Sequence, residues 1–413
     1  MFILTYNQKG FAALFVTILV LAIMLGLGFS ITILVLGEQQ ISKNIVRSTQ
    51  SYYIAEAGIE DALWRLKEVP KMAGLSYNFN VGNDSVDVNI PDIVGGSRTI
   101  ISQGDMSNRI KRIEVVYEID SEEISFHYGA QVGDGGMQLD NNSIVNGNIF
   151  STGDINVTGN AIITDTVMVA GLTNSITGVN INGDAHVDTC NNSTILGDLY
   201  ALNDNSCNYS SFIFQAAPDP IPLPISDSQI TQWKEEAEAG GIIAGDYNLS
   251  GSDKASLGPK KIQGNLLLED NSQLTIEGTI WVVGNVNVKN NAEVHLDDFY
   301  GGTSGVLISD GIIILENNSI SSGSGQPGSY LMYVSISPSN PAIELKNNTV
   351  VDIIYTSNGW ITIENNADLR EAIGYGIYLK NNAEISYEVG LVNVFFTSGP
   401  GGSWKVKTWE EIE

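Results

Sequence analysis

The stretch "YLKNNAEI" at residues 378–385 places two asparagines between short apolar runs, and the chain repeats this unit many times. Each copy combines alternating apolar residues with a pair of turn-forming residues, which predicts a short strand, a turn and a second short strand. The clearest further copies are "ITIENNADL" (361–369), "IELKNNTV" (343–350), "IILENNSI" (313–320) and "VNVKNNAEV" (286–294). Looser copies are "LLLEDNSQL" (266–274), "MQLDNNSI" (137–144) and "DTCNNSTI" (188–195).

The repeat keeps a fixed internal distance, because in five copies a glycine stands six residues before the first position of the pair. Successive pairs from Asp270 to Asn381 are 16 to 30 residues apart. Stacked coils of strand produce repeats of this size. We therefore predict a mainly β fold built as a parallel β-helix, with a β-sandwich as the alternative. The glycines are Gly135, Gly264, Gly284, Gly311 and Gly359.

Asparagine suits the corner of such a coil for two reasons. It tolerates the left-handed backbone conformation of a sharp bend, and stacked side-chain amides can hydrogen-bond from coil to coil. We interpret these asparagines as structural turn residues, and a row of sugar-binding amides is the alternative. The residues concerned are Asn141, Asn142, Asn191, Asn192, Asn271, Asn290, Asn291, Asn317, Asn318, Asn347, Asn348, Asn365, Asn366, Asn381 and Asn382.

The chain begins with a long apolar segment, since residues 11–37 contain no charged residue over 27 positions. As a helix they would span about 40 Å, enough to cross a hydrocarbon core of about 30 Å. A cleaved secretory signal is the alternative, but the apolar core of such a signal is only about 7–15 residues long. Residues 38–70 continue with apolar residues three and four apart, which predicts an amphipathic helix that ends before Pro70.

Two stretches of this region resemble type IV prepilins and the PilX N-terminal family of minor pilins. They are "NQKGFAALFVTILVLAIML" (7–25) and "SYYIAEAGIEDALWRL" (51–66). The resemblance implies a leader peptide at residues 1–10, cut after Gly10 so that Phe11 becomes the new N-terminus. The chain departs from the family at Phe15, where type IV pilins usually carry a glutamate that pairs with a neighbouring subunit. This departure favours a minor or tip subunit over a major shaft subunit.

Composition divides the rest of the chain into five segments. Residues 71–130 hold alternating strand patterns, predicted to form a small connecting, pilin-like β region. Residues 131–215 and 261–403 are the two predicted solenoid blocks. A Pro-rich strap with a short helix is predicted between them at 216–260, and the charged segment 404–413 is predicted to be a polar C-terminal cap.

The 413-residue chain is acidic, with a formal net charge of −27. Because such a surface repels phosphate, we expect no nucleic-acid partner. The three histidines are far apart in the sequence, so no metal site is predicted and no cofactor is expected beyond weakly bound Ca²⁺. In an exported domain, the only two cysteines, Cys190 and Cys207, are expected to form a disulfide.

These features predict a membrane-anchored, minor-pilin-like surface protein with a structural or adhesive role, associated with type IV pilus or pseudopilus assembly. It would cross the cell membrane once and hold its C-terminal domain at the cell surface. The expected partners are the membrane, other pilin-like subunits and a glycan or surface ligand. The alternatives are a plain N-anchored β-helix that binds polysaccharide, and a bactofilin-like scaffold that assembles with itself.

An enzyme is a further alternative, because parallel β-helices include polysaccharide lyases and hydrolases. Such enzymes need clustered carboxylates on one face of a coil. The acidic residues here fall mostly in turns, and no spacing singles out a catalytic pair, so we predict a protein that is not an enzyme. The carboxylates considered are Asp134, Asp154, Asp184, Asp297 and Asp298.

Overall fold

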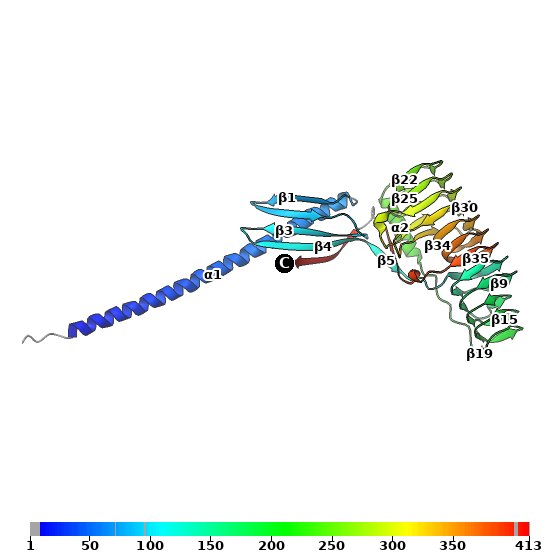
Figure 1. Ribbon diagram of the computed structural model, residues 1–413, viewed down its shortest axis with the longest axis horizontal. Helices are drawn as coiled ribbons and strands as arrows, with labels where there is room; N and C mark the ends of the chain where they lie inside the picture. Colours follow the sequence, from blue (N-terminus) through cyan, green and yellow to red (C-terminus); the bar gives the residue numbers. More distant parts are fainter. Residues whose placement is uncertain (1–8, 71, 95, 400–403, 413) are drawn as a thin grey trace, which may run out of the picture.

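The computed structural model describes residues 9–70, 72–94, 96–399 and 404–412. Figure 1 shows three parts in succession: a long helix, a small sheet packed on the second half of that helix, and a stack of short strands beyond the sheet. We call the small sheet with its part of the helix the head, and the stack of strands the solenoid.

Helix α1 (Lys9–Glu68) runs without a break for 60 residues and ends two residues before Pro70. Its side chains are exposed from residue 11 to about residue 50. Beyond that point one face is buried, at positions three or four apart that fall on a single side of a helix. The buried residues are Ser51, Ile54, Ala55, Gly58, Ile59, Ala62 and Leu66.

The head sheet packs on this buried face of α1 and is antiparallel, in the order β1-β2-β3-β4-β38. The backbone carbonyl of Ser51 and the backbone nitrogen of Ala55 approach Gly104 so closely that a Cβ there would lie 2.3 and 2.6 Å from them. A glycine is therefore required for this contact. The strands are β1 (Leu75–Val81), β2 (Asp84–Ile90), β3 (Ser97–Asp105), β4 (Ile110–Ile119) and β38 (Trp404–Ile412).

Strand β38 corrects the prediction of a polar cap at residues 404–413. It pairs antiparallel with β4, with Trp404 opposite Ile119, so the last strand of the chain belongs to the head. The solenoid is thus an insertion between two neighbouring strands of the head sheet. The chain leaves the head through β5 (Ser121–Ile124) and returns to it through β37 (Val394–Thr397). These two strands pair with each other and form a two-stranded ribbon that we call the neck.

The solenoid is one parallel sheet of 31 strands, wound so that each coil contributes to three faces. This arrangement confirms the predicted parallel β-helix, and the β-sandwich alternative is wrong. The first face contains, in stacking order, β20 (Ile242–Ile243), β23 (Lys260–Ile262), β26 (Ile280–Val282), β29 (Gly305–Ser309), β32 (Leu331–Ser335), parts of β34 (Val350–Glu364), β35 (Asp368–Lys380) and β6 (Ala130–Asp140), then β8 (Ile149–Ser151), β11 (Val167–Val169), β14 (Ala185–His186), β17 (Leu199–Ala201) and β19 (Phe212–Phe214).

The other two faces follow the same stacking order. Strands β34 and β35 each bend around all three faces, and β6 bends from the first face to the second. The second face contains β21 (Tyr247–Leu249), β24 (Leu266–Leu268), β27 (Val286–Lys289), β30 (Ile313–Glu316), β33 (Ile343–Lys346), β9 (Ile155–Thr158), β12 (Ser175–Thr177), β15 (Thr189–Asn191) and β18 (Asn203–Asn205). The third contains β22 (Lys254–Leu257), β25 (Gln273–Ile276), β28 (Glu293–Leu296), β31 (Ile320–Ser322), β36 (Glu384–Ser386), β7 (Ile144–Asn146), β10 (Ile162–Ile163), β13 (Asn180–Ile181) and β16 (Thr194–Ile195).

The two blocks of the solenoid are stacked in an order that differs from their order in the chain. The first block runs outward from β6 to β19, and the second starts at the opposite end with β20 and returns to meet the first. The last long strand of the second block, β35, pairs in parallel with β6, and β36 pairs with β7. We call this junction the seam. The second block begins at Ile242, which corrects the predicted boundary at residue 261.

A connecting strap, residues 215–226, crosses the seam on the outside of the first face. The carbonyl oxygen of Pro222 accepts a hydrogen bond from the Gln131 side chain in the first block, and that of Ile225 accepts one from the Tyr355 hydroxyl in the second. Helix α2 (Asp227–Ala239) follows, capped by Ser226, whose side chain accepts a bond from the backbone nitrogen of Gln229. The strap thus ties the two blocks together.

Two apolar clusters stabilise the solenoid. Aliphatic side chains fill its interior from end to end. A second cluster lies outside the first face, where α2, the neck and the short helix η2 (Val389–Asn393) cover outward-facing residues of β29, β32, β34 and β35. Trp233 of α2 packs against Phe396 of the neck there, with ring centroids 6.0 Å apart. A further short helix, η1 (Asp298–Tyr300), lies between β28 and β29.

The fixed glycine positions are explained by the close approach of successive turns. The backbone nitrogen of Gly284 donates to the carbonyl oxygen of Gly264, and that of Gly311 donates to Gly284, at 2.9 and 3.2 Å. A Cβ on Gly284 would lie 2.7 Å from the Gly264 oxygen. No side chain fits at that distance, so Gly284 cannot be replaced by a larger residue without moving the neighbouring turn.

Candidate functional site

The first candidate site is the exposed, apolar half of α1. An 18-residue window of this helix has a mean hydropathy of 2.8, and none of that window is buried against the rest of the chain. By length and composition the helix can cross a membrane. Phe11 and Phe15 are 76% and 63% exposed. Gly10 lies within the helix, whereas the predicted leader falls mainly on residues 1–8, which lie outside the described residues.

The second candidate site is the corner between the second and third faces, where the paired asparagines stack. Both residues of each pair adopt positive φ angles, between 47° and 68°, from Asp270 and Asn271 through to Asn141 and Asn142. This is the left-handed region that asparagine tolerates better than other residues with a side chain. The pairs therefore occupy equivalent positions in successive coils.

The side chains of the pairs form two parallel hydrogen-bond ladders. In the first, each Nδ2 donates to the Oδ1 of the preceding coil, as from Asn347 to Asn317 at 2.8 Å and from Asn365 to Asn347 at 3.0 Å. The second ladder links Asn348 to Asn318 at 3.0 Å in the same direction. Both ladders cross the seam, because Asn141 donates to Asn381 at 3.0 Å and Asn142 donates to Asn382 at 3.5 Å.

One predicted member of the set has a different position. Asn191 lies in strand β15, and only Asn192 of that pair has a positive φ, of 45°. The side chain of Asn191 still bonds between coils, since it accepts from Asn205 at 2.8 Å. The predicted turn at Asn191 is therefore wrong, and this part of the stack uses coils of 14 residues with a different corner.

The residue before each pair forms a charged row that the sequence analysis missed. In stacking order the row alternates in sign. The signal was visible in the sequence as a regular alternation of acid and lysine immediately before the pair. The row consists of Glu269, Lys289, Glu316, Lys346, Glu364, Lys380 and Asp140.

Ion pairs connect neighbouring members of this row. Lys289 lies 3.1 Å from Glu269, Lys346 lies 3.3 Å from Glu316, and Lys380 lies 2.8 Å from Glu364. Each pair is partly exposed, so each contributes about 1 kcal/mol or less. The alternation nevertheless opposes those changes in coil order that would place two coils of like charge next to each other.

We expect the Lys346→Glu variant to lower the stability of the solenoid by about 1–2 kcal/mol relative to wild type, because it groups carboxylates along the row. Burial lowers the pKa of Lys346, but bonds to Glu344 and Glu316 hold it above its usual value. Urea unfolding in low salt measures the loss. The neutral Lys346→Gln variant is the control, and an equal loss in both variants, unchanged in 1 M salt, would contradict an electrostatic cause.

Cys190 and Cys207 are joined by a disulfide near the outer end of the first block. Cys190 is buried in strand β15, while Cys207 follows β18 in the next coil. The bond closes a loop with a sequence separation of 17 residues. It therefore ties the terminal coil to the coil beneath it.

We expect replacement of both cysteines by serine to lower the stability of this end by about 2–3 kcal/mol, since a closed loop restricts the unfolded chain. Hydrogen exchange should show faster exchange in β15 to β19 and no change in the head. Reduction of the wild-type protein should reproduce this pattern. If β15 to β19 exchange at the same rate in the double-serine variant as in the oxidised wild-type protein, the bond does not stabilise the terminal coils.

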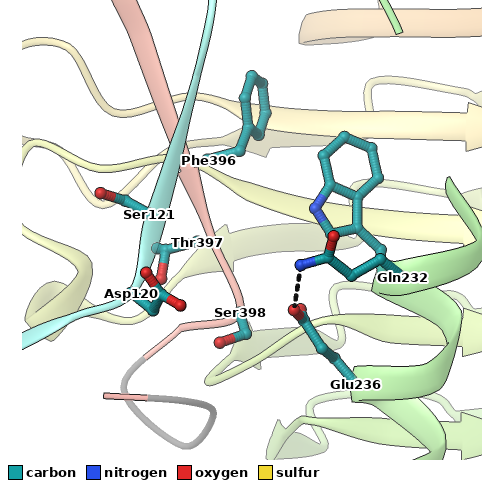
Figure 2. Close-up of a pocket in the computed structure, with 8 residues that line it drawn as sticks. Asp120, Ser121, Gln232, Glu236, Phe396, Thr397 and Ser398 are labelled. Carbon is teal, nitrogen blue, oxygen red and sulfur yellow. Dashed lines mark hydrogen bonds between the residues drawn. The ribbon is translucent and has the colours of Figure 1, made fainter. Parts of the chain in front are cut away.

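A cavity of about 200 Å³ lies where the neck meets α2 (Figure 2). Gln232 and Glu236 line it from α2 and bond to each other at 3.3 Å, and Asp120 lies opposite and forms an ion pair with Lys405 of the head at 2.9 Å. These polar groups already take part in structural contacts. The cavity therefore marks the junction of head and solenoid, and we assign no ligand to it.

Structural hydrogen bonds hold four of the turn carboxylates that were considered for catalysis. Asp184 accepts from the backbone nitrogen of Asp198 at 2.8 Å. Asp134 accepts from Thr152 at 2.9 Å, Asp154 accepts from the backbone of Ser175 at 2.7 Å, and Asp297 caps η1. Among the described ranges, no three His, Cys, Asp or Glu residues are grouped closely enough to hold a metal ion.

Comparison with known proteins gives one family match. Residues 9–60 match the model of the PilX N-terminal family. No curated protein matches the chain. Among solved structures, the competence-associated pilin ComZ from Thermus thermophilus is similar, with 9% identity and a TM-score of 0.24 over 89% of this chain and 97% of that chain. The similarity is therefore to the PilX N-terminal family, and it is limited to residues 9–60, within helix α1.

Proposed function

We propose that this protein is a membrane-anchored, minor-pilin-like subunit of a type IV pilus or pseudopilus that carries its β-helical rod outside the membrane. The observation that supports this most directly is the division of α1. Its first half is apolar and exposed, whereas its second half, from Ser51 to Leu66, packs on the head sheet. One helix thus offers a segment for lipid or neighbouring helices and a segment that holds a folded head.

The position of the solenoid is consistent with display at a surface. It is inserted in the head at the β4–β38 edge and lies on the side away from the exposed half of α1 (Figure 1). The neck joins it to the head by two strands rather than one. A rod held in this way would project away from the membrane, where a glycan or a surface could contact it.

The experiment is to localise the full-length protein and to measure the mass of its N-terminus. We expect recovery in sheared surface fractions and an N-terminus at Phe11, cut after Gly10. The Gly10→Val variant should keep Met1 and be absent from those fractions. Wild-type protein found only in membranes with Met1 intact would overturn the pilin role and leave a plain membrane anchor.

The Phe15→Glu variant tests the expectation that this chain is a minor or tip subunit because it lacks a glutamate at residue 15. A carboxylate in the apolar segment is costly unless it is paired. If the introduced carboxylate pairs with a neighbouring subunit, more of the protein should be incorporated and recovered in the sheared fractions. A Phe15→Gln variant is the matched control, because it is polar and carries no charge. Equal recovery of both variants would show that Phe15 does not limit incorporation.

A further inference from the structure

The two ends of the solenoid leave strand edges unpaired. At one end, β20, β21 and β22 pair only with the next coil inward. At the other end, β18 and β19 likewise pair on one side only. Within the described part of the chain, no strand pairs with the outer edges of these five strands. Unpaired parallel edges are templates for further strands.

Inside the solenoid, side chains at equivalent positions of successive coils stack in rows, which we call columns. The apolar columns of the interior continue to both ends of the solenoid. Phe212 and Phe214 extend the inward-facing columns of Leu199 and Ala201, yet they are 39% and 75% exposed. At the opposite end Ile243 packs on the core and is only partly buried. Large inward-facing aromatic side chains in solvent are unfavourable, because each buried Phe contributes about 1.5–3 kcal/mol.

The seam shows which kind of partner suits such ends. There, the final coil of one block pairs in parallel with the first coil of another block that is distant in sequence. The apolar columns, both asparagine ladders and the alternating charges continue across it. Coil ends of this chain are therefore able to join without a covalent connection between them.

We infer that solenoids of two copies of this chain stack head to tail, with β19 of one copy pairing in parallel with β20 of the next. The columns set the register. Ile213 extends the outward column that ends at Ile242, and Phe214 extends the inward column that ends at Ile243. Phe212 then faces Gly241, which has no side chain and leaves room for the ring.

This contact is compatible with membrane anchors, because the stack runs across the direction of α1 (Figure 1). Stacked copies would therefore hold their helices side by side and not end on end. Head-to-tail contacts generate open chains, whereas contacts between like ends would stop at a dimer. The inference goes beyond the proposed function, since it depends on the solenoid and not on pilus assembly.

The test uses the full chain in detergent micelles with cysteines at both ends of the outward column, Ile213→Cys with Ile242→Cys. A short bismaleimide should produce a ladder of dimers, trimers and longer species on a denaturing gel. Either single variant should remain monomeric. Dimers from Ile213→Cys alone would overturn the head-to-tail contact in favour of like ends. Monomer alone in the double variant, with both thiols reactive towards a fluorescent maleimide, would exclude stacking altogether.

A charge at the contact provides an independent measurement in the same double-cysteine background. Phe214→Asp should reduce the cross-linked product by about tenfold or more, because it places a carboxylate against the apolar column. Leu172→Asp is the matched control, since Leu172 is also 75% exposed but lies in a loop before the last coils. Equal reduction in both variants would contradict a contact at β19.

Discussion

The Asn347→Val variant is expected to destabilise the solenoid by about 3–4 kcal/mol. Asn347 lies in the middle of a ladder, donates to Asn317 at 2.8 Å and accepts from Asn365 at 3.0 Å. Loss of the two hydrogen bonds costs about 0.5–1.5 kcal/mol each. In addition, a β-branched residue at φ 59° is strained by about 1–2 kcal/mol.

Two further variants separate these contributions. Asn347→Gly removes both ladder bonds but accepts the left-handed conformation, so it should cost about 1–3 kcal/mol. Asn347→Asp keeps an acceptor and loses the donor, so its loss in free energy of unfolding should be close to that of the glycine variant. Urea unfolding followed by circular dichroism gives the free energies. If valine and glycine cost the same, the conformational argument is wrong; if neither costs anything, the ladder does not stabilise the fold.

The second large effect is expected at Glu371, a fully buried carboxyl group in β35. Neither of its oxygens has a hydrogen-bond partner among the described residues. Asp352 in the neighbouring coil differs, because it accepts bonds from the backbone nitrogens of Gly323 and Leu331 and from Arg370. Burial without such partners raises the pKa of Glu371 well above its usual value.

The sign of the pH dependence follows from this raised pKa. The folded state holds the proton more tightly than the unfolded state, so the contribution of Glu371 to stability is greatest below the unfolded-state pKa of about 4.3. As pH rises towards the folded-state pKa, that contribution is lost by about 1.4 kcal/mol per pH unit. At neutral pH, wild-type solenoid should therefore be less stable than a variant that cannot ionise.

The measurement compares wild type, Glu371→Gln and Glu371→Leu between pH 5 and pH 7. Relative to wild type, both variants should gain stability as the pH rises from 5 to 7, at a rate of up to about 1.4 kcal/mol per pH unit. The Gln variant measures the effect of ionisation alone, because it keeps the shape and the polar atoms of the side chain. The Leu variant removes the buried polar atoms as well. Parallel pH profiles for all three proteins would contradict a raised pKa.

The solenoid was predictable because its corners demand particular residues. A pair such as Asn365 and Asn366, with a glycine six residues before it, reports a left-handed bend and a close approach between turns. These constraints act on residues that are close together in the sequence, so the local sequence pattern reveals them. The similarity of residues 9–60 to the PilX N-terminal family has the same basis, since these residues lie in one uninterrupted helix.

The pairing of strands that are far apart in the chain was much harder to predict from the sequence. The segment 404–413 has a charged pattern that suits a cap as well as an edge strand, and only its pairing with β4 distinguishes the two. Asn191 was misplaced because "NNS" looks the same in a coil of 14 residues as in longer ones. The charge alternation was present in the sequence, but its meaning depends on knowing which coils are neighbours.

The sequence by itself determined the repeating coil, its asparagine corner and the apolar helix, because each depends on backbone conformation or hydrophobic pattern within a few residues. Only the tertiary structure decided the order in which the coils stack. The seam between β35 and β6 and the return of β38 to the head join segments that are distant in the chain. Parallel strands with similar apolar residues can pair in many orders, so their order cannot be read from a local pattern. In the structure, the strap, the neck and the ion pairs between coils all connect segments in the observed order.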